Sequence, residues 1–168
     1  MSKIKIAFQG EKGAYSHIAC EEIYKDAEII NCISFEETFR TAFEDEDTKA
    51  IIPLENSLAG RVADIHYLLP KYKLQVYGEH FQKVEHCLLG KQEAELKDIK
   101  YVRSHAQAIG QCQNVIKKNN FKSIISADTA GSAKDLAGSG DKSIAAIASE
   151  LAAKIYGLKV LKKNIEDE

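Results

Sequence analysis

Residues 101–118 read YVRSHAQAIGQCQNVIKK and predict a strand that is followed by a helix. The strand is expected over Tyr101–Ser104 and the helix over Gln107–Lys118. Three apolar side chains of the expected helix recur at spacings of three and four residues, which places them on one face. Small polar residues separate the two elements. This stretch therefore indicates a strand–helix unit of an α/β sheet.

The same order of strand, polar residues and helix recurs elsewhere in the chain. Further strands are expected at Lys3–Phe8, Glu28–Ile33, Thr48–Pro53, Ser123–Ser126, Ser143–Ile147 and Leu158–Leu161. Further helices are expected at Ser16–Tyr24, after the capping box that begins at Ser34, from Val62 to Pro70, at Thr129–Ala137 and at Ser149–Tyr156. The alternation predicts an α/β fold with parallel-type packing.

A midsection around Val76–Leu89 interrupts this alternation with extended segments that have no helical period. It predicts two α/β lobes that are joined by extended crossover segments, with a cleft between them. We expect residues 1–79 and 150–168 to form the first lobe and residues 80–149 to form the second.

The composition excludes several classes of protein. The chain has 168 residues, of which 45% are hydrophobic and 29% charged, and this content argues against a disordered chain. The formal net charge of −2 argues against nonspecific electrostatic binding to nucleic acid. The sequence contains no run of about 18 apolar residues that would predict a membrane span, and no signal peptide is recognisable in it. Four scattered cysteines then indicate reduced thiols and a cytoplasmic protein.

Small polar residues stand at the starts of several expected helices. They are Tyr15-Ser16-His17, Asn56-Ser57, Ser104-His105-Ala106-Gln107, Asp128-Thr129-Ala130-Gly131-Ser132 and Ser149. The carboxyl ends of parallel strands face the ligand crevice in open α/β sheets, and each helix N-terminus there favours an anion. Several such ends together would hold a small dicarboxylate without an excess of Lys or Arg. Taken singly, each of these residues is more ordinarily a helix N-cap.

The stretch Pro53–Gly60 is the most unusual in the chain, because a strand ends at a proline and a carboxylate and an amide follow at its mouth. A carboxylate beside an amide serves either in acid–base chemistry or in holding a turn together. The local chemistry favours turn stabilisation for Glu55 and ligand binding for Asn56, and Glu55 is kept as a candidate catalytic residue.

Motifs for metals and for nucleotide cofactors are missing from the sequence. The five histidines and four cysteines do not have the spacing of a zinc site. The glycines form neither a P-loop nor a dinucleotide-binding fingerprint. The sequence therefore predicts neither a zinc site nor a nucleotide-phosphate loop of these types.

Several blocks of the chain, in this order, resemble the prephenate dehydratase family. They are Gly10–Ser16, Pro53–Ser57 with Gly60, Gly78-Glu79, His86–Leu89, Ser104–Gln107 with Gln111-Cys112, Asp128–Ala133, and Ala145–Ser149 leading to Tyr156–Leu158. The resemblance covers residues 3–165, and its specificity comes from the order and spacing of the blocks.

The resemblance implies a two-lobed fold of the periplasmic-binding-protein type (type II), an active site in the inter-lobe cleft, and homodimers. The implied reaction converts prephenate, a small dicarboxylate, into phenylpyruvate in L-phenylalanine biosynthesis, without a metal or cofactor. The candidate substrate-binding residues are Asn56, Ser57, Ser104, His105, Gln107, Thr129 and Ala130. The candidate catalytic residues are Thr129 and Glu55.

The sequence departs from the family in three respects. Family members continue into a Thr-Arg-Phe motif, whose Thr is held essential, and then into a phenylalanine-sensing domain, whereas this chain stops at Glu168. Members also usually have Pro at the position of Ala106 and Ser at the position of Asp128. These departures predict a chain that keeps the binding cleft and has low turnover.

Two other functions fit the same sequence. A non-enzymatic module of this fold would bind a small anion without converting it. An arogenate dehydratase would act on the close analogue of prephenate that carries an amino group. No sequence feature separates prephenate from arogenate as the substrate.

Overall fold

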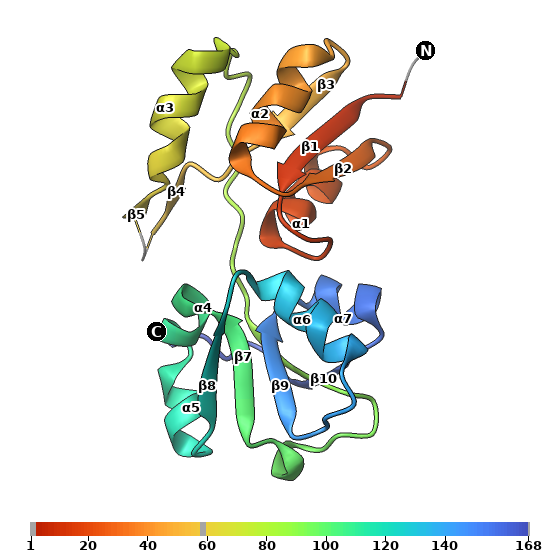
Figure 1. Ribbon diagram of the computed structural model, residues 1–168, viewed down its shortest axis with the longest axis vertical. Helices are drawn as coiled ribbons and strands as arrows, with labels where there is room; N and C mark the ends of the chain where they lie inside the picture. The colour runs from red at the N-terminus through yellow and green to blue at the C-terminus, as the bar shows by residue number, and fades with distance from the viewer. Residues whose placement is uncertain (1–2, 58–59, 168) are drawn as a thin grey trace. The chain divides into compact units, whose positions relative to one another are not determined.

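The computed structural model describes residues 3–57 and 60–167, which form two compact units (Figure 1). Unit 1 comprises Met1–Glu11 and Tyr15–Gln82, and unit 2 comprises Lys12–Ala14 and Lys83–Glu168. The two-unit α/β organisation expected from the sequence is therefore confirmed.

Unit 1 is built on a three-stranded parallel sheet with the strand order β2-β1-β3. The strands are β1 (Lys5–Gln9), β2 (Glu28–Cys32) and β3 (Thr48–Ile51). The helices are α1 (Tyr15–Ile23), α2 (Phe35–Glu44) and α3 (Ala63–Tyr72), and a short antiparallel pair joins β4 (Glu55–Asn56) to β5 (Gly60–Arg61). The middle of the central strand β1 is completely buried, as expected for a strand with neighbours on both sides.

The start of α2 follows from local sequence. The Ser34 hydroxyl accepts a hydrogen bond from the Glu37 N–H at 3.1 Å, which confirms the predicted cap. The Glu37 carboxylate reaches one residue further back than a standard capping box and accepts from the Ile33 N–H at 2.7 Å.

The predicted end of α3 was wrong. Pro70 lies inside the helix, which continues to Tyr72 and ends at Lys73 in the left-handed conformation. A proline in a helix interior removes one backbone donor and disfavours the helix, so the last turn of α3 forms against that preference. Here Lys71 donates to the Glu36 carboxylate at 2.7 Å, and the Tyr72 hydroxyl donates to the same carboxylate.

Unit 2 contains a five-stranded mixed sheet with the order β10-β6-β9-β7-β8. The strands are β6 (Cys87–Gly90), β7 (Tyr101–His105), β8 (Lys122–Ser126), β9 (Ile144–Ala148) and β10 (Lys159–Lys162). The helices are α4 (Ala106–Gly110), α5 (Gln113–Lys118), α6 (Thr129–Gly138) and α7 (Glu150–Tyr156), with a 3₁₀ turn, η1, at Leu96–Asp98. β7, β8 and β9 are parallel, whereas β6 is antiparallel to β9 and β10.

Both faces of this sheet are covered by apolar side chains. Successive residues of a strand point to opposite faces, and the buried residues of β9 accordingly divide between two clusters. Ala145 and Ile147 pack with α4 and α5, whereas Ala146 and Ala148 pack with α6 and α7. The near-continuous apolar runs of the strands therefore reflect a sheet that is buried on both sides.

Residues 150–168 were assigned to the wrong lobe by the sequence analysis. The structure places them in unit 2, because β10 pairs antiparallel with β6 and because Ala152 and Ala153 of α7 lie in the core of this unit. The last residue of unit 1 in this crossover is Gln82, whereas the expected end of the first lobe was residue 79.

The single helix expected over Gln107–Lys118 is interrupted. α4 ends at Gly110, Gln111 closes it, and α5 begins after Cys112, whose backbone is not helical (φ −125°, ψ 27°). The periodicity was right for each half, and a distant segment, described below, makes hydrogen bonds at the break between them.

None of the helices within residues 3–57 and 60–167 is both long and apolar enough to cross a membrane.

Candidate active site

The carboxyl ends of β7, β8 and β9 lie at one edge of the unit 2 sheet, because the three strands are parallel neighbours (Figure 1). α4, α6 and α7 begin close after these strand ends. Three helices therefore begin at this edge, as predicted from the polar residues of Ser104–Gln107, Asp128–Ala130 and Ser149. We refer to it as the carboxyl edge.

The hydroxyls of Ser104 and Ser149 fix the backbone of the carboxyl edge. Ser104 is completely buried and donates to the Ile147 carbonyl of β9 at 2.6 Å. Ser149 is the N-cap of α7, accepts from the Ala152 N–H at 3.0 Å and donates to the Gly13 carbonyl at 2.5 Å. Both side chains thus hold neighbouring segments together, and Ser104 has no surface that a solute can reach.

The start of α4 is more accessible. His105 is its N-cap, and Nδ1 of the ring accepts from the Gln107 N–H at 3.3 Å. The side chain of Gln107 is exposed and carries both a donor and an acceptor. Gln107 is therefore the residue of this helix start that is best suited to contact a ligand.

The start of α6 has the charge distribution of an anion site, with one exception. The Asp128 carboxylate accepts from the Gly131 N–H at 2.5 Å and so forms the N-cap. The first-turn N–H groups of Thr129 and Ala130 have no acceptor within the helix. The negative charge of Asp128 opposes a second anion at this end, while the helix dipole favours one.

The loop Lys12–Ala14 also belongs to unit 2 and packs on the start of α7. Besides the contact with Ser149, the Tyr156 hydroxyl donates to the Lys12 carbonyl at 2.9 Å. Gly13 has φ +93°, and a Cβ at this position would lie 2.7 Å from the Ala152 Cα. Only glycine therefore fits there, which gives the Gly10–Ser16 block a structural reason.

Glu55, Asn56 and Ser57 lie in unit 1, where the first two form β4 and Ser57 follows in a turn. Glu55 and Ser57 are exposed, and Asn56 is partly buried. The other candidate residues lie in unit 2, so the convergence of both groups on one ligand stays a prediction.

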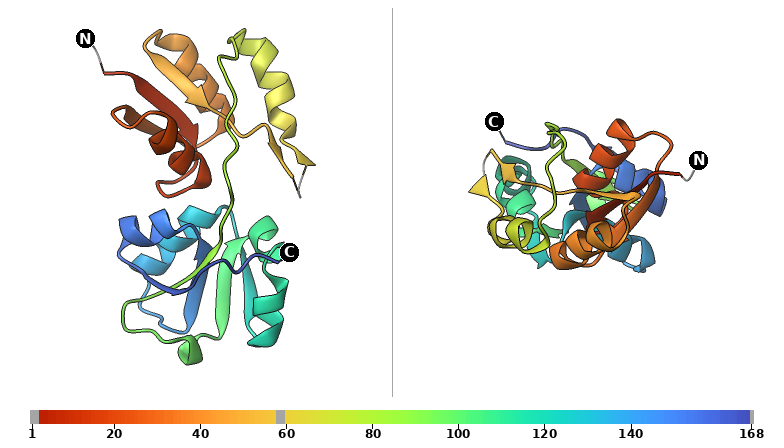
Figure 2. Two further views of the ribbon diagram at one scale, coloured as in Figure 1. Left: turned by 180° about the vertical axis from the view of Figure 1, so that it is seen from behind. Right: turned by 90° about the horizontal axis from the view of Figure 1, so that it is seen from above.

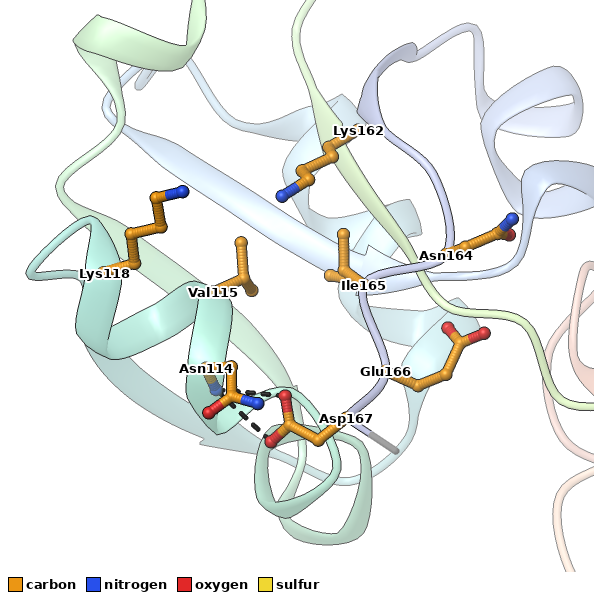
Figure 3. Close-up of a pocket in the computed structure, with 8 residues that line it drawn as sticks. All are labelled: Asn114, Val115, Lys118, Lys162, Asn164, Ile165, Glu166 and Asp167. Carbon is orange, nitrogen blue, oxygen red and sulfur yellow. Dashed lines mark hydrogen bonds between the residues drawn. The ribbon is translucent and has the colours of Figure 1, made fainter.

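Two cavities were not anticipated from the sequence. One, of about 340 Å³, is in unit 2 between α5, the end of β10 and the following segment (Figure 3). It is lined by Asn114, Val115, Lys118, Lys162, Asn164, Ile165, Glu166 and Asp167. The other, of about 430 Å³, is in unit 1 and is lined by Gln9, Ser34, Phe35, Glu36, Asp64, Tyr67 and Leu68. Their walls come from residues far apart in the sequence, which no local pattern reveals.

Covalent chemistry by the cysteines is disfavoured. All four thiols are free and buried, and burial raises the pKa of Cys20 and Cys112 to about 12. Residues 3–57 and 60–167 contain no group of three or more His, Cys, Asp or Glu side chains placed to hold a metal ion. The side chains that the carboxyl edge presents are the Thr129 hydroxyl, the Gln107 amide, the His105 ring and the Asp128 carboxylate.

The prephenate dehydratase family model matches residues 6–168. The chain belongs to this family. The bifunctional N-acyl-homoserine lactone acylase/prephenate dehydratase of Komagataeibacter europaeus is 41% identical over 162 residues, covering 96% of this chain and 58% of that protein. Arogenate dehydratase/prephenate dehydratase 2 of Arabidopsis thaliana is 40% identical over 171 residues, covering 99% of this chain and 44% of that protein. The chain thus spans about half the length of these curated relatives.

Solved structures agree with the family. A quorum-quenching acylase matches with a TM-score of 0.92 and 41% identity, over 97% of this chain and 60% of that chain. Prephenate dehydratase of Arthrobacter aurescens, in complex with L-Phe, matches with a TM-score of 0.89 and 27% identity, over 98% and 56%. The expected α/β fold is therefore confirmed.

Proposed function

We propose that the chain converts prephenate into phenylpyruvate, water and carbon dioxide, as a step of L-phenylalanine biosynthesis. The match of the prephenate dehydratase family model over residues 6–168 carries the proposal. The carboxyl edge of unit 2 adds support, since its exposed groups suit an anionic substrate that reacts without a cofactor.

The reaction needs little from the protein besides positioning and one proton. The bond between the ring and its carboxylate breaks and releases carbon dioxide, and the electron pair moves into the ring. The C–O bond on the opposite side of the ring then breaks, and hydroxide takes up a proton to leave as water. The product ring is aromatic, so the enzyme has to hold the anions, supply the proton and exclude solvent.

The start of α6 and the side chain of Gln107 suit the first of these tasks. The N-terminus of α6 contributes about 0.3–1 kcal/mol to anion binding when exposed, and up to ~2 kcal/mol when partly buried. The Thr129 hydroxyl adds a donor at the same place. We assign Thr129, Gln107 and His105 to substrate contacts in unit 2, and Asn56 and Ser57 to contacts made from unit 1. Ala130 is completely buried and, like Ser104, is not assigned to the substrate.

The proton donor is assigned to the catalytic candidates Thr129 and Glu55. A general acid accelerates such a step typically by 10²–10⁴-fold. Glu55 is an exposed carboxyl group of β4. Glu55→Gln keeps the shape and removes the acid, so a kcat unchanged from pH 5 to pH 8 would exclude Glu55 as the donor.

A steady-state assay with prephenate tests the proposal directly. Phenylpyruvate formation above the spontaneous rate is the expected result, even if turnover is low. Calorimetry on the same sample separates catalysis from binding, because an anion-binding module would release heat with prephenate and yield no product. Absence of product would contradict the proposal, whether or not heat is released.

Arogenate is the second substrate to compare. Relatives from Arabidopsis thaliana and Petunia hybrida carry arogenate dehydratase in their names. Phenylalanine would be the product, and the ratio of kcat/KM for the two substrates decides which one the chain prefers.

Hydrolysis of N-acyl-homoserine lactones is a second candidate function, favoured by the 41% identity to the acylase/prephenate dehydratase of Komagataeibacter europaeus. A covalent acyl-enzyme route through Ser104, Ser149, Cys20 or Cys112 is disfavoured. The two serine hydroxyls donate to backbone carbonyls, and the two thiols are buried. Incubation with an acyl-homoserine lactone, followed by detection of the free homoserine lactone, tests this activity.

A homodimer and a cytoplasmic location remain part of the proposal. Light scattering after size-exclusion chromatography measures the mass of the assembly in solution. A mass of one chain at micromolar concentration would contradict the dimer.

A further inference from the structure

The segment Ile165–Asp167, which follows β10, crosses the unit 2 sheet and reaches the junction between α4 and α5 (Figure 2). We call it the clasp. Ile165 is buried in the same apolar cluster as Cys112 and Val115. The Ile165 N–H donates to the His86 carbonyl at 3.0 Å, and the His86 N–H donates to the Glu166 carboxylate at 2.8 Å. The clasp is thus fixed to the residue that precedes β6.

Asp167 closes the break in the predicted helix. Its carboxylate accepts from the Asn114 N–H at 3.0 and 3.3 Å, in the first turn of α5 (Figure 3). Cys112, the N-cap residue of α5, makes no side-chain cap. Asp167 therefore performs, from 53 residues away, the capping function that a local Ser or Asp performs at other helices.

The same clasp holds the end of α4. The Asp167 N–H donates to the Gln111 carbonyl at 2.6 Å, and Nε2 of His86 lies 2.8 Å from Oε1 of Gln111. The Gln111 N–H in turn donates to the Gln107 carbonyl at 2.9 Å. One continuous set of hydrogen bonds, which passes through the backbone of Gln111, leads from the clasp to Gln107.

α4 has only five residues and depends on these contacts. A helix this short is not stable by itself, since isolated helices under about 12–15 residues are marginal in water. His105 caps its first turn, and Gln111 closes its last. The position of the Gln107 side chain is therefore set as much by the Gln111 end as by β7.

We propose that Gln111 and Asp167 are positioning residues, which hold α4 so that Gln107 is presented to the substrate. The proposal rests on the proposed function, because Gln107 is taken as a substrate contact. Neither residue touches the substrate. Their loss should weaken substrate binding while the chemical step, carried out elsewhere, proceeds at nearly the same rate.

The test compares Gln111→Ala and Asp167→Ala with wild type in steady-state kinetics on prephenate and in hydrogen exchange of the α4 amides. We expect KM to rise about tenfold and kcat to change less than twofold. Exchange of the amides of residues 107–110 should become about tenfold faster. Asp167→Asn keeps one acceptor for the Asn114 N–H and should restore most of the KM.

Two control variants match these substitutions. Asn114→Ala keeps the backbone N–H that Asp167 binds and removes only an exposed side chain. Gln92→Ala removes a glutamine whose amide bonds the Gly157 carbonyl instead. Both should behave as wild type. Should Gln111→Ala not fold, Gln111→Met keeps the length of the side chain and removes only its polar atoms.

The outcomes separate the two proposals. Unchanged KM and unchanged exchange at residues 107–110 would overturn the positioning role. If exchange became faster by the same factor at all amides of the protein, with no selective effect on α4, the positioning role would be overturned as well. Wild type without product from prephenate would contradict the proposed function alone, and the exchange experiment would still decide the role of the clasp.

Discussion

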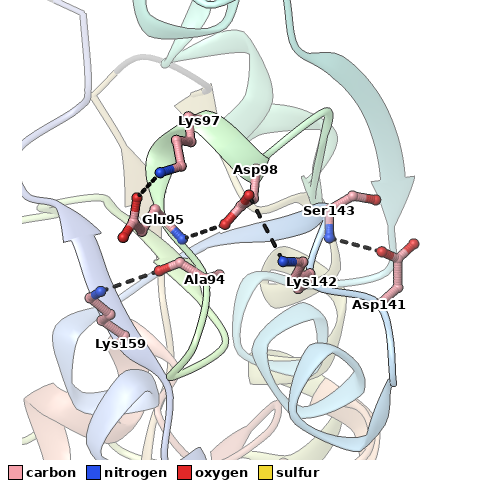
Figure 4. Close-up of polar contacts among 8 residues, drawn as sticks. All are labelled: Ala94, Glu95, Lys97, Asp98, Asp141, Lys142, Ser143 and Lys159. Atoms are coloured by element: carbon pink, nitrogen blue, oxygen red, sulfur yellow. Dashed lines mark hydrogen bonds and ion pairs between the residues drawn. The ribbon is translucent and has the colours of Figure 1, made fainter.

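The two ends of the unit 2 sheet are held together by different residue types. At the amino ends of β7 and β9, charged side chains pair with one another and close turns (Figure 4). Lys97 lies 2.7 Å from Glu95, Lys142 lies 4.0 Å from Asp98, and the Asp141 carboxylate accepts from the Ser143 N–H at 2.8 Å. At the carboxyl edge, uncharged Ser104 and Ser149 hold the backbone.

The direction of the helices explains this difference. α6 ends near the amino ends of the strands, and helix C-termini carry carbonyl groups that favour cations. Lys91 accordingly donates to the Ser139 carbonyl, which lies just after α6. The carboxyl edge receives the helix N-termini, whose N–H groups favour anions. A binding site for a dicarboxylate is therefore expected at one end of the sheet and not at the other.

The largest expected effect is on catalytic activity, which should depend on residues of the carboxyl edge and not on residues at the amino ends of the strands. Gln107→Ala combined with Thr129→Val should lower kcat/KM for prephenate about 100-fold, or roughly 3 kcal/mol, because two hydrogen bonds to a charged ligand are lost. Lys142→Ala at the amino end should leave kcat/KM unchanged. Equal losses in the two proteins would remove the distinction between the ends.

The second effect concerns stability at the carboxyl edge. Ser104→Ala should lower the free energy of unfolding by about 1–3 kcal/mol, since it leaves the buried Ile147 carbonyl without its donor. Ser123→Ala, on the exposed part of β8, should change it by less than about 0.5 kcal/mol. Urea denaturation measures both, and a neutral Ser104→Ala would show that the hydroxyl is not needed for the edge.

A smaller effect tests the charge at the start of α6. Asp128→Ser keeps an N-cap oxygen and removes the negative charge that faces an incoming anion. We expect KM for prephenate to fall about two- to fivefold at low ionic strength, and the gain to shrink in 0.5 M salt because of screening. An increase in KM would instead assign Asp128 to a favourable contact.

The smallest effects are pH dependences, which differ between the ends. Burial lowers the pKa of His86, at the carboxyl edge, below its ordinary value of 6.5. As the pH falls below 6.5, this histidine is protonated in the unfolded chain before it is protonated in the folded one, so the free energy of unfolding decreases. The hydrogen bond from the Glu95 N–H lowers the pKa of the partly exposed Asp98 carboxyl at the amino end. Its contribution is present above pH 3.8 and is lost as pH falls through the lowered pKa.

Denaturation between pH 7 and pH 3 measures both windows. His86→Gln should flatten the dependence between pH 7 and pH 5, and Asp98→Asn should flatten it only below pH 4. A slope between pH 7 and pH 5 that survives in His86→Gln would assign this window to another group.

Short-range features of the fold could be predicted from the sequence. The Ser34 cap of α2, the Ser149 cap of α7 and the strands of both sheets depend on neighbours within a few residues. Their hydrogen-bonding and apolar patterns are therefore visible locally. The candidate residues of unit 2 were found for the same reason, because a strand end followed by a helix start is a local pattern.

Long-range features required the coordinates. The assignment of residues 150–168 failed because β10 finds its partner β6 about 70 residues earlier in the chain, and strand pairing leaves no mark in either segment. The break between α4 and α5 was missed because Asp167, not a residue of the helix, makes the cap.

The sequence by itself determined the α/β class, the caps and the polar helix starts, since each depends on the chemistry of adjacent residues. Only the tertiary structure decided that Ser104 is buried and bonded to the neighbouring strand β9, that the loop Lys12–Ala14 packs on α7, and that the clasp contacts the end of α4. These features join segments far apart in the chain. Packing and hydrogen bonding bring such segments together only when the whole unit has folded.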